Sequence, residues 1–96
     1  MFLKKYLSES KFNLLLDTYE EFYLNDLDEN SFIEIYNLLK KYNFYFIDDI
    51  ILNYLEIFSM EAIEVEEKIL ELKDKLGDKF NYIIGIDMRY LESILE

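Results

Sequence analysis

Histidine, cysteine and proline are absent from this chain of 96 residues, and glycine occurs only twice. Without histidine there is no side chain that exchanges protons near neutral pH and no imidazole to bind a metal. Without cysteine there is no thiolate nucleophile, no disulfide and no thiolate zinc site. We therefore predict a binding protein rather than an enzyme, with no catalytic residues, no metal and no cofactor.

Positive charge is also scarce. Ten basic side chains stand against 21 carboxylates, which gives a net charge of −11. The excess lies in two blocks: residues 17–39 hold seven acids and no base, and residues 48–72 hold eight acids and one lysine. Such a surface repels nucleic-acid phosphates and anionic membranes, so we expect neither as a direct partner. A basic protein is the expected partner.

No long apolar run is present either. The longest stretch without a charged residue covers 80–86, far short of the roughly 20 residues that a membrane span needs. The first seven residues contain two lysines and have neither the continuous apolar region nor the small-residue cleavage site of a secretory signal. We expect no membrane span and a cytoplasmic location.

The scarcity of glycine and proline argues against a β-sandwich or barrel, which needs many turns. Apolar residues instead recur at helical spacing. Because 96 residues are too few for two separate cores, we predict one acidic helical domain over 1–96. The expected fold is all-α, a compact bundle of four to five short helices.

The first helix is predicted by a stripe of apolar residues at positions 12, 15, 16, 19 and 23. Ser8 or Ser10 is positioned to cap its start by accepting a hydrogen bond from a free backbone N–H. The polar run 25–30 then predicts a turn.

The second predicted helix begins after Asn30 or Ser31, either of which suits an N-cap, and ends near Asn43. The third covers 48–58 and has so little polar face that we expect it to be the central, most buried helix. The stretch 43–47 has the composition of a short strand, but a single strand without a partner leaves its backbone unsatisfied.

The fourth helix is predicted over 60–76, with Ser59 as its N-cap and Gly77 just beyond its last turn. Its apolar side chains step by three and four along one seam. This seam consists of Ala62, Val65, Ile69, Leu72 and Leu76.

A last short helix is predicted over 88–95, capped by Asp87. The preceding stretch 78–86 fits either a helix or an extended connection around Gly85. The side chains of the last helix that we expect to face inward are Met88, Leu91 and Leu95.

Two carboxylate clusters are candidates for metal sites. Residues 26–30 begin like a calcium-binding loop, but Ser31 stands where the sharp turn needs glycine and Asn37 where the bidentate glutamate belongs. A turn followed by a helix cap fits better. Glu61, Glu64 and Glu67 share one helix face, yet a bundle metal site of carboxylates normally includes a Glu-x-x-His. A solvated acidic face is the favoured interpretation.

Aromatic residues are abundant, with nine tyrosines and eight phenylalanines, although an AT-rich coding sequence also favours these residues. The densest run is Phe44, Tyr45 and Phe46, directly before the acids Asp48 and Asp49. Either these rings pack in the core at a helix junction, or they form an interface patch in which aromatic anchors supply affinity and carboxylates supply steering.

These observations favour an inhibitor-like binding module that docks its acidic surface on a basic, nucleic-acid-handling protein. Its carboxylates would take the place of phosphates and pair with arginine and lysine of the target. The candidate partner-binding residues are Asp17, Glu20, Glu21, Asp26, Asp28, Glu29, Tyr45, Asp48, Asp49, Glu61, Glu64 and Glu67.

In size, charge and helicity the chain resembles small phage-encoded inhibitors of host defence nucleases, anti-CRISPR proteins among them. It is similar in the same respects to the acidic helical immunity proteins that neutralise nuclease toxins. These resemblances imply a nuclease, a CRISPR effector or a toxin as the partner and assign no functional residue. The alternative is a homo-oligomeric structural or assembly protein, in which the aromatic surplus and the 62–76 seam are buried between copies.

Overall fold

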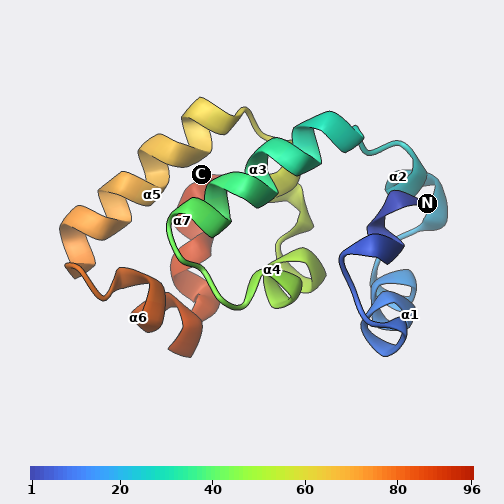
Figure 1. Cartoon of the computed structure of the whole chain (residues 1–96), viewed down its shortest axis with the longest axis horizontal. Helices are drawn as coiled ribbons and strands as arrows, with labels where there is room; N and C mark the ends of the chain where they lie inside the picture. Colours follow the sequence, from blue (N-terminus) through green and yellow to red (C-terminus); the bar gives the residue numbers. More distant parts are fainter.

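The computed structural model describes all 96 residues and contains helices but no strand (Figure 1). The all-α prediction is confirmed. The chain forms seven α-helices rather than the predicted four to five, because the first predicted helix is broken and the open stretch around Gly85 is helical. The α-helices are α1 Glu9–Thr18, α2 Glu21–Asn25, α3 Glu29–Lys41, α4 Ile47–Asn53, α5 Ala62–Leu76, α6 Phe80–Ile86 and α7 Glu92–Leu95. Three short 3-10 helices accompany them: η1 Phe2–Lys5, η2 Leu55–Ser59 and η3 Met88–Leu91.

The first predicted helix is two helices, α1 and α2. Ser8 caps α1 as expected, since its hydroxyl accepts a hydrogen bond from the backbone N–H of Lys11 at 3.3 Å. At the other end the Thr18 hydroxyl donates to the carbonyl of Leu14 at 2.9 Å, a side-chain bond that competes with the helical backbone. Tyr19 follows in an extended conformation, with φ −119° and ψ 145°. The prediction of one continuous helix over 12–23 is therefore wrong.

The predicted turn precedes α3, but its N-cap is Asp28 rather than Asn30 or Ser31. One carboxylate oxygen of Asp28 accepts from the backbone N–H of Ser31 at 3.3 Å and from its hydroxyl at 2.9 Å. Three of the four residues from 28 to 31 are of types suited to capping, so the sequence alone does not distinguish Asp28 from Asn30 and Ser31.

The end of α3 explains why no strand follows it. Asn43 adopts a positive φ of 64°, a conformation that asparagine tolerates better than most residues. The N–H of Phe44 donates to the carbonyl of Leu39 at 3.1 Å, and that of Asn43 to Lys40 at 3.0 Å. This pair of bonds is the Schellman motif, completed by burial of both Phe44 and Leu39.

The segment predicted as one helix over 48–58 is divided into α4 and η2 at Tyr54, whose φ is −137°. Directly before this point, the Asn53 amide donates to the carbonyl of Asp49 at 2.9 Å, again a side-chain bond to the helix backbone. The expected burial is confirmed: Ile50, Ile51, Leu55 and Ile57 are fully buried.

The helix α5 matches its prediction closely. It ends at Leu76, and Gly77 follows with φ 88°, a conformation that glycine adopts without strain. Its seam residues Val65, Ile69 and Leu72 are buried against α3, α6 and α7. Its N-cap is Glu61 instead of Ser59, and no side-chain hydrogen bond caps this end.

At the end of the chain the predicted helix cap is present, but the set of buried side chains differs from the prediction. The Asp87 carboxylate accepts from the backbone N–H of Arg89 at 3.2 Å, and Leu91 is buried as expected. Leu95 is exposed, however, and Ile94 is buried instead. The last turns begin as a 3-10 helix, whose repeat of three residues aligns Met88, Leu91 and Ile94.

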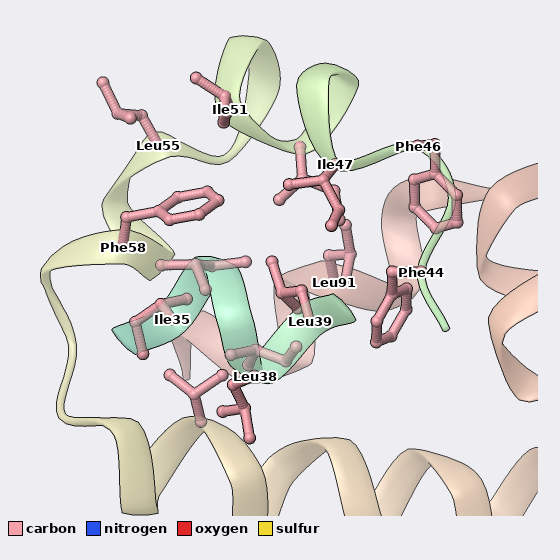
Figure 2. Packing of buried hydrophobic residues seen from close by; sticks show 14 of the residues in the cluster. Ile35, Leu38, Leu39, Phe44, Phe46, Ile47, Ile51, Leu55, Phe58 and Leu91 are labelled. Carbon is pink, nitrogen blue, oxygen red and sulfur yellow. The ribbon is translucent and has the colours of Figure 1, made fainter. Parts of the chain in front are cut away.

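The core is one cluster of 23 buried residues, all of them apolar. Figure 2 shows Ile35, Leu38 and Leu39 of α3 lying between the α4–η2 segment and α5. Helix α3 also contacts η2, α4 and α5, so it occupies the central position that we predicted for residues 48–58. The Phe58 ring stacks on the Phe32 ring of α3, with 4.7 Å between ring centroids.

The radius of gyration is 13.1 Å, close to the roughly 13 Å of a compact domain of about 100 residues. The molecule is somewhat elongated, with extents of 37 × 24 × 22 Å. No helix combines the length and the apolar character that crossing a bilayer requires.

Truncation of core residues provides a test of this packing. Ile51→Ala, Leu55→Ala, Ile69→Ala and Leu72→Ala should each lower the free energy of unfolding by about 2–5 kcal/mol, because each leaves a cavity in a dense apolar interior. Denaturant unfolding followed by circular dichroism measures this loss. The matched control is Ile63→Ala on exposed α5 surface, which should change stability by no more than about 0.5 kcal/mol. Equal losses at Ile63 and Ile69 would contradict the packing.

Candidate partner-binding surface

Seven of the eleven candidate acids fall into two exposed groups that lie apart in the structure. Four of them, Asp17, Glu20, Glu21 and Asp26, lie on or beside α1 and α2 and are exposed. The other group, Glu61, Glu64 and Glu67, lies on α5 and is also exposed. Figure 1 shows α1 and α2 at one end of the long axis and α5 toward the other end. We call these the α2 group and the α5 group.

Asp48 and Asp49 form internal ion pairs with Lys11 of α1. The ammonium of Lys11 donates to Asp48 and lies 3.6 Å from Asp49. This hydrogen bond is the main reason why the pKa of the Asp48 carboxyl lies below its ordinary value of 3.8. These carboxylates connect α1 to α4, and the hydrogen bond from Lys11 to Asp48 links residues 37 positions apart. They therefore stabilise the packing of the two helices.

Two further candidates have local roles. Asp28 caps α3, and the hydroxyl and backbone N–H of Ser31 lower the pKa of its carboxyl. Glu29 lies 3.8 Å from the ammonium of Lys5 in an exposed ion pair, which contributes little to stability. The sequence predicted the charges of these residues but not the partners that they find.

The α5 group is larger than predicted. Glu71 and Asp74 are also exposed and continue the spacing of Glu64 and Glu67 by three and four residues along α5. That spacing was a signal available in the sequence. Ile63 lies on the same helix and is 67% exposed, so this acidic face also offers apolar contact area. We call Glu64, Glu67, Glu71 and Asp74 the α5 acidic row.

Glu66, in contrast, belongs to the packing of α3 against α5. Its carboxylate accepts from the Tyr42 hydroxyl at 2.7 Å and from the Lys41 ammonium at 3.2 Å. The Tyr42 hydrogen bond is the largest cause of the lowered pKa of Glu66, followed by that from Lys41. Lys41, which follows the acidic block 17–39, thus forms an ion pair with Glu66 of the acidic block 48–72.

Tyr45 differs from its aromatic neighbours in solvent exposure. Phe44 and Phe46 are buried, whereas Tyr45 is 65% exposed and packs edge-on against Phe46, with 5.0 Å between ring centroids. Core packing is therefore observed for the two phenylalanines, and only Tyr45 is exposed as the interface alternative requires. A role of Tyr45 in an interface stays a prediction. The Tyr45 ring lies so close to Gly85 that a Cβ there would meet its Cζ at 2.9 Å.

The exposed face of α6 adjoins Tyr45. Tyr82 and Ile86 are both exposed and lie one helical turn apart. The Asn81 amide fixes α6 to the preceding segment by donating to the carbonyl of Asn43 at 3.0 Å. We call Tyr45, Tyr82 and Ile86 the Tyr45 patch. The sequence analysis selected only the tyrosine of this patch.

A cleft of about 390 Å³ opens beside the α2 group, between α2 and the start of α3. Phe22 lines it and is 72% exposed. Phe22 is not among the predicted site residues, and apolar spacing gave no signal for it, because Phe22 follows Tyr19 by three positions and Leu15 by seven and so continues the apolar stripe of the predicted first helix. The break of that helix at Tyr19 is visible only in the structure. The lining residues are Phe22, Tyr23, Asp26, Leu27, Asp28, Ser31, Phe58 and Ser59. We call this the α2–α3 cleft.

No group of three or more carboxylates is arranged to hold a metal ion. Comparison with protein-family models, with curated proteins and with solved structures finds no match to this chain. The surface chemistry therefore has to be interpreted from the residues themselves: exposed carboxylates in two groups, with exposed apolar side chains beside each.

The ion pair between α1 and α4 predicts a pH dependence of stability. A carboxyl whose pKa is lowered by folding stabilises the fold above its ordinary pKa, and this contribution is lost as the pH falls through the folded-state pKa. The stability difference between the parent and Asp48→Asn should therefore be present at about pH 6, begin to decline near the ordinary pKa of 3.8 and be lost as the pH falls through the lower folded-state pKa of Asp48.

Denaturant unfolding at a series of pH values measures this difference. Lys11→Met serves as the matched variant, because it removes the other partner of the same hydrogen bond. Asp48→Asn should have little further effect in the Lys11→Met background. A stability difference that stays constant through the acid range would contradict the role of this ion pair.

Proposed function

We propose that this protein is a non-catalytic inhibitor that binds a basic, nucleic-acid-handling protein and blocks it by charge mimicry. The observation that carries the proposal is the state of seven candidate carboxylates. All seven are exposed, and none takes part in the five ion pairs of the structure. They are Asp17, Glu20, Glu21, Asp26, Glu61, Glu64 and Glu67.

Unpaired carboxylates on a rigid body match what a phosphate-binding surface recognises. Arginine and lysine side chains that contact a nucleic-acid backbone would pair with these carboxylates and would no longer be free for phosphate. The field of a protein with net charge −11 also attracts a basic target over distance and raises the association rate. Salt shortens the range of this attraction, so binding should weaken as ionic strength rises.

Exposed apolar residues support a specific interface rather than charge attraction alone. Ile63 and Leu70 lie beside the α5 acidic row, and Phe22 lies on α2 beside the α2 group. Apolar anchors within a polar, charged rim are the usual anatomy of a protein–protein interface. Because the two acidic groups lie toward opposite ends of the molecule, a single flat target surface would contact one group closely and sense the other through its field.

Charge reversal tests the mechanism. The triple variant Glu61→Lys, Glu64→Lys and Glu67→Lys should slow association with a basic partner, captured from the native host's lysate at low salt and identified by mass spectrometry. These residues are exposed and outside the core, so circular dichroism should show helix content near that of the parent. Stopped-flow or surface-based kinetics at several salt concentrations measures the association rate.

A second triple variant, Asp17→Lys, Glu20→Lys and Glu21→Lys, tests the α2 group in the same way. The control is Glu9→Lys, Glu92→Lys and Glu96→Lys, which changes net charge equally at exposed positions outside both groups. Reversal within a contacting group should reduce the rate more than the control does. If neither reversal has a larger effect than the control, charge mimicry at these surfaces is wrong.

The homo-oligomeric alternative is supported by one observation and limited by another. The Tyr45 patch is exposed and apolar, as a surface buried between copies would be. The 62–76 seam, however, is buried against α3, α6 and α7 within a single chain. Oligomerisation would therefore have to use the Tyr45 patch rather than the seam.

Sedimentation of the purified protein at micromolar concentration separates the two functions. The inhibitor should sediment as a monomer of 11.8 kDa. A dimer or larger species that is dissociated by Ile86→Glu, with Leu95→Glu as the exposed apolar control, would favour the assembly protein.

A further inference from the structure

The α2–α3 cleft differs from other surface hollows of this molecule in its charge. Four other clefts each include a lysine or the arginine among their lining residues: Lys4, Lys73, Lys40 and Arg89. The α2–α3 cleft has none, and its lining includes the carboxylates of Asp26 and Asp28. Asp26 takes part in none of the five ion pairs. The cleft thus presents uncompensated negative charge.

Its remaining lining is aromatic and apolar. Phe58 is almost fully buried and is held by stacking on Phe32, so it provides a fixed floor. Phe22, in contrast to Phe58, is exposed to solvent. It lines the cleft but packs in no aromatic pair. An exposed ring beside a free carboxylate is a surface that a planar cation can cover.

A third acid lies beside this cleft. The Tyr19 hydroxyl donates to Glu56 at 3.4 Å, and the Tyr19 ring packs edge-on against Tyr23, which lines the cleft, at 5.6 Å between ring centroids. Burial raises the pKa of the Tyr23 hydroxyl, and the charge of Glu56 raises it further. Glu56 therefore adds negative potential at the cleft wall.

We propose that the α2–α3 cleft binds the guanidinium group of an arginine side chain from the basic partner, stacked on Phe22 and paired with Asp26. This inference rests on the proposed function and identifies one contact within it. The volume of about 390 Å³ leaves room for one side chain of a partner.

Arginine fits this lining better than the other candidates. A guanidinium is planar, stacks on aromatic faces and donates two parallel hydrogen bonds to one carboxylate. A lysine ammonium is more strongly hydrated and lacks the planar face. A purely apolar side chain would remove water from Asp26 without offering it a hydrogen bond, which is unfavourable.

Blocked peptides of four residues provide the direct test: tetra-arginine, tetra-lysine and tetra-citrulline, titrated separately into the isotopically labelled full-length protein. Citrulline has nearly the shape of arginine without its charge. Two-dimensional NMR should show amide shifts in residues 22–31 with tetra-arginine, weaker binding of tetra-lysine and no binding of tetra-citrulline. Equal affinity for the arginine and lysine peptides, or shifts confined to α5, would overturn the proposal.

Matched variants separate stacking from general charge. Phe22→Ala should weaken tetra-arginine binding by roughly three- to tenfold, whereas Tyr82→Ala, an exposed aromatic elsewhere, should leave it unchanged. Asp26→Asn should weaken binding more than Glu64→Gln, although the two variants have the same net charge. All four positions are exposed, so the fold should persist. Equal effects within either pair would show only diffuse attraction and would overturn the proposal.

The captured partner distinguishes failure of this inference from failure of the proposed function. If the partner binds Phe22→Ala as tightly as the parent, with unchanged salt dependence, the inferred cleft contact is wrong and charge mimicry is unaffected. Specific tetra-arginine binding in the cleft, together with no effect of any acid reversal on the partner, would instead overturn charge mimicry. Competition by tetra-arginine against the partner, lost in Phe22→Ala, is the result that supports both.

Discussion

The burial of apolar side chains around α3 has to hold together a surface that repels itself. All 23 buried residues are apolar, and no polar or charged residue is buried, so the carboxylates behind the net charge of −11 lie at or near the surface. Self-repulsion at such a net charge opposes compaction. The interior therefore supplies the opposing free energy through hydrophobic burial and close packing. α3 lies between α5 and the α4–η2 segment, and most of the fold is arranged about it (Figure 2).

Three of the ten basic residues form ion pairs where helical elements meet. Lys11 joins α1 to α4, Lys41 joins α3 to α5, and Lys5 of η1 lies against Glu29 at the start of α3. The acids at these contacts are paired, whereas the exposed carboxylates of the α2 group and of the α5 acidic row take part in none of the five ion pairs. The pattern of free charge is thus a consequence of how the helices pack. The proposed binding of a basic partner depends on this division rather than on net charge alone.

Local signals in the sequence predicted much of the fold. The seam of α5, the glycine after it, the Ser8 cap and the end of α3 near Asn43 each depend on residues within a few positions of one another. The breaks at Tyr19 and Tyr54 coincide instead with side-chain bonds from Thr18 and Asn53 to the backbone, which weaken a helix locally and which apolar spacing does not predict. In the candidate surface, exposure of the acids followed from their charge. Their pairing did not, since Lys11 meets Asp48 across 37 residues and only the tertiary structure brings them together.

Charge alone makes a poor inhibitor, because every basic surface attracts a polyanion to a similar degree. Selectivity requires contacts that exclude water and that a wrong partner cannot satisfy. The exposed apolar residues beside the acids, Phe22 in one group and Ile63 and Leu70 in the other, provide sites where this can happen. In the α2–α3 cleft, a carboxylate without a lysine partner and an unpaired ring lie within one hollow. A cation there gains from both only if it is planar, so shape adds to charge in the choice of partner.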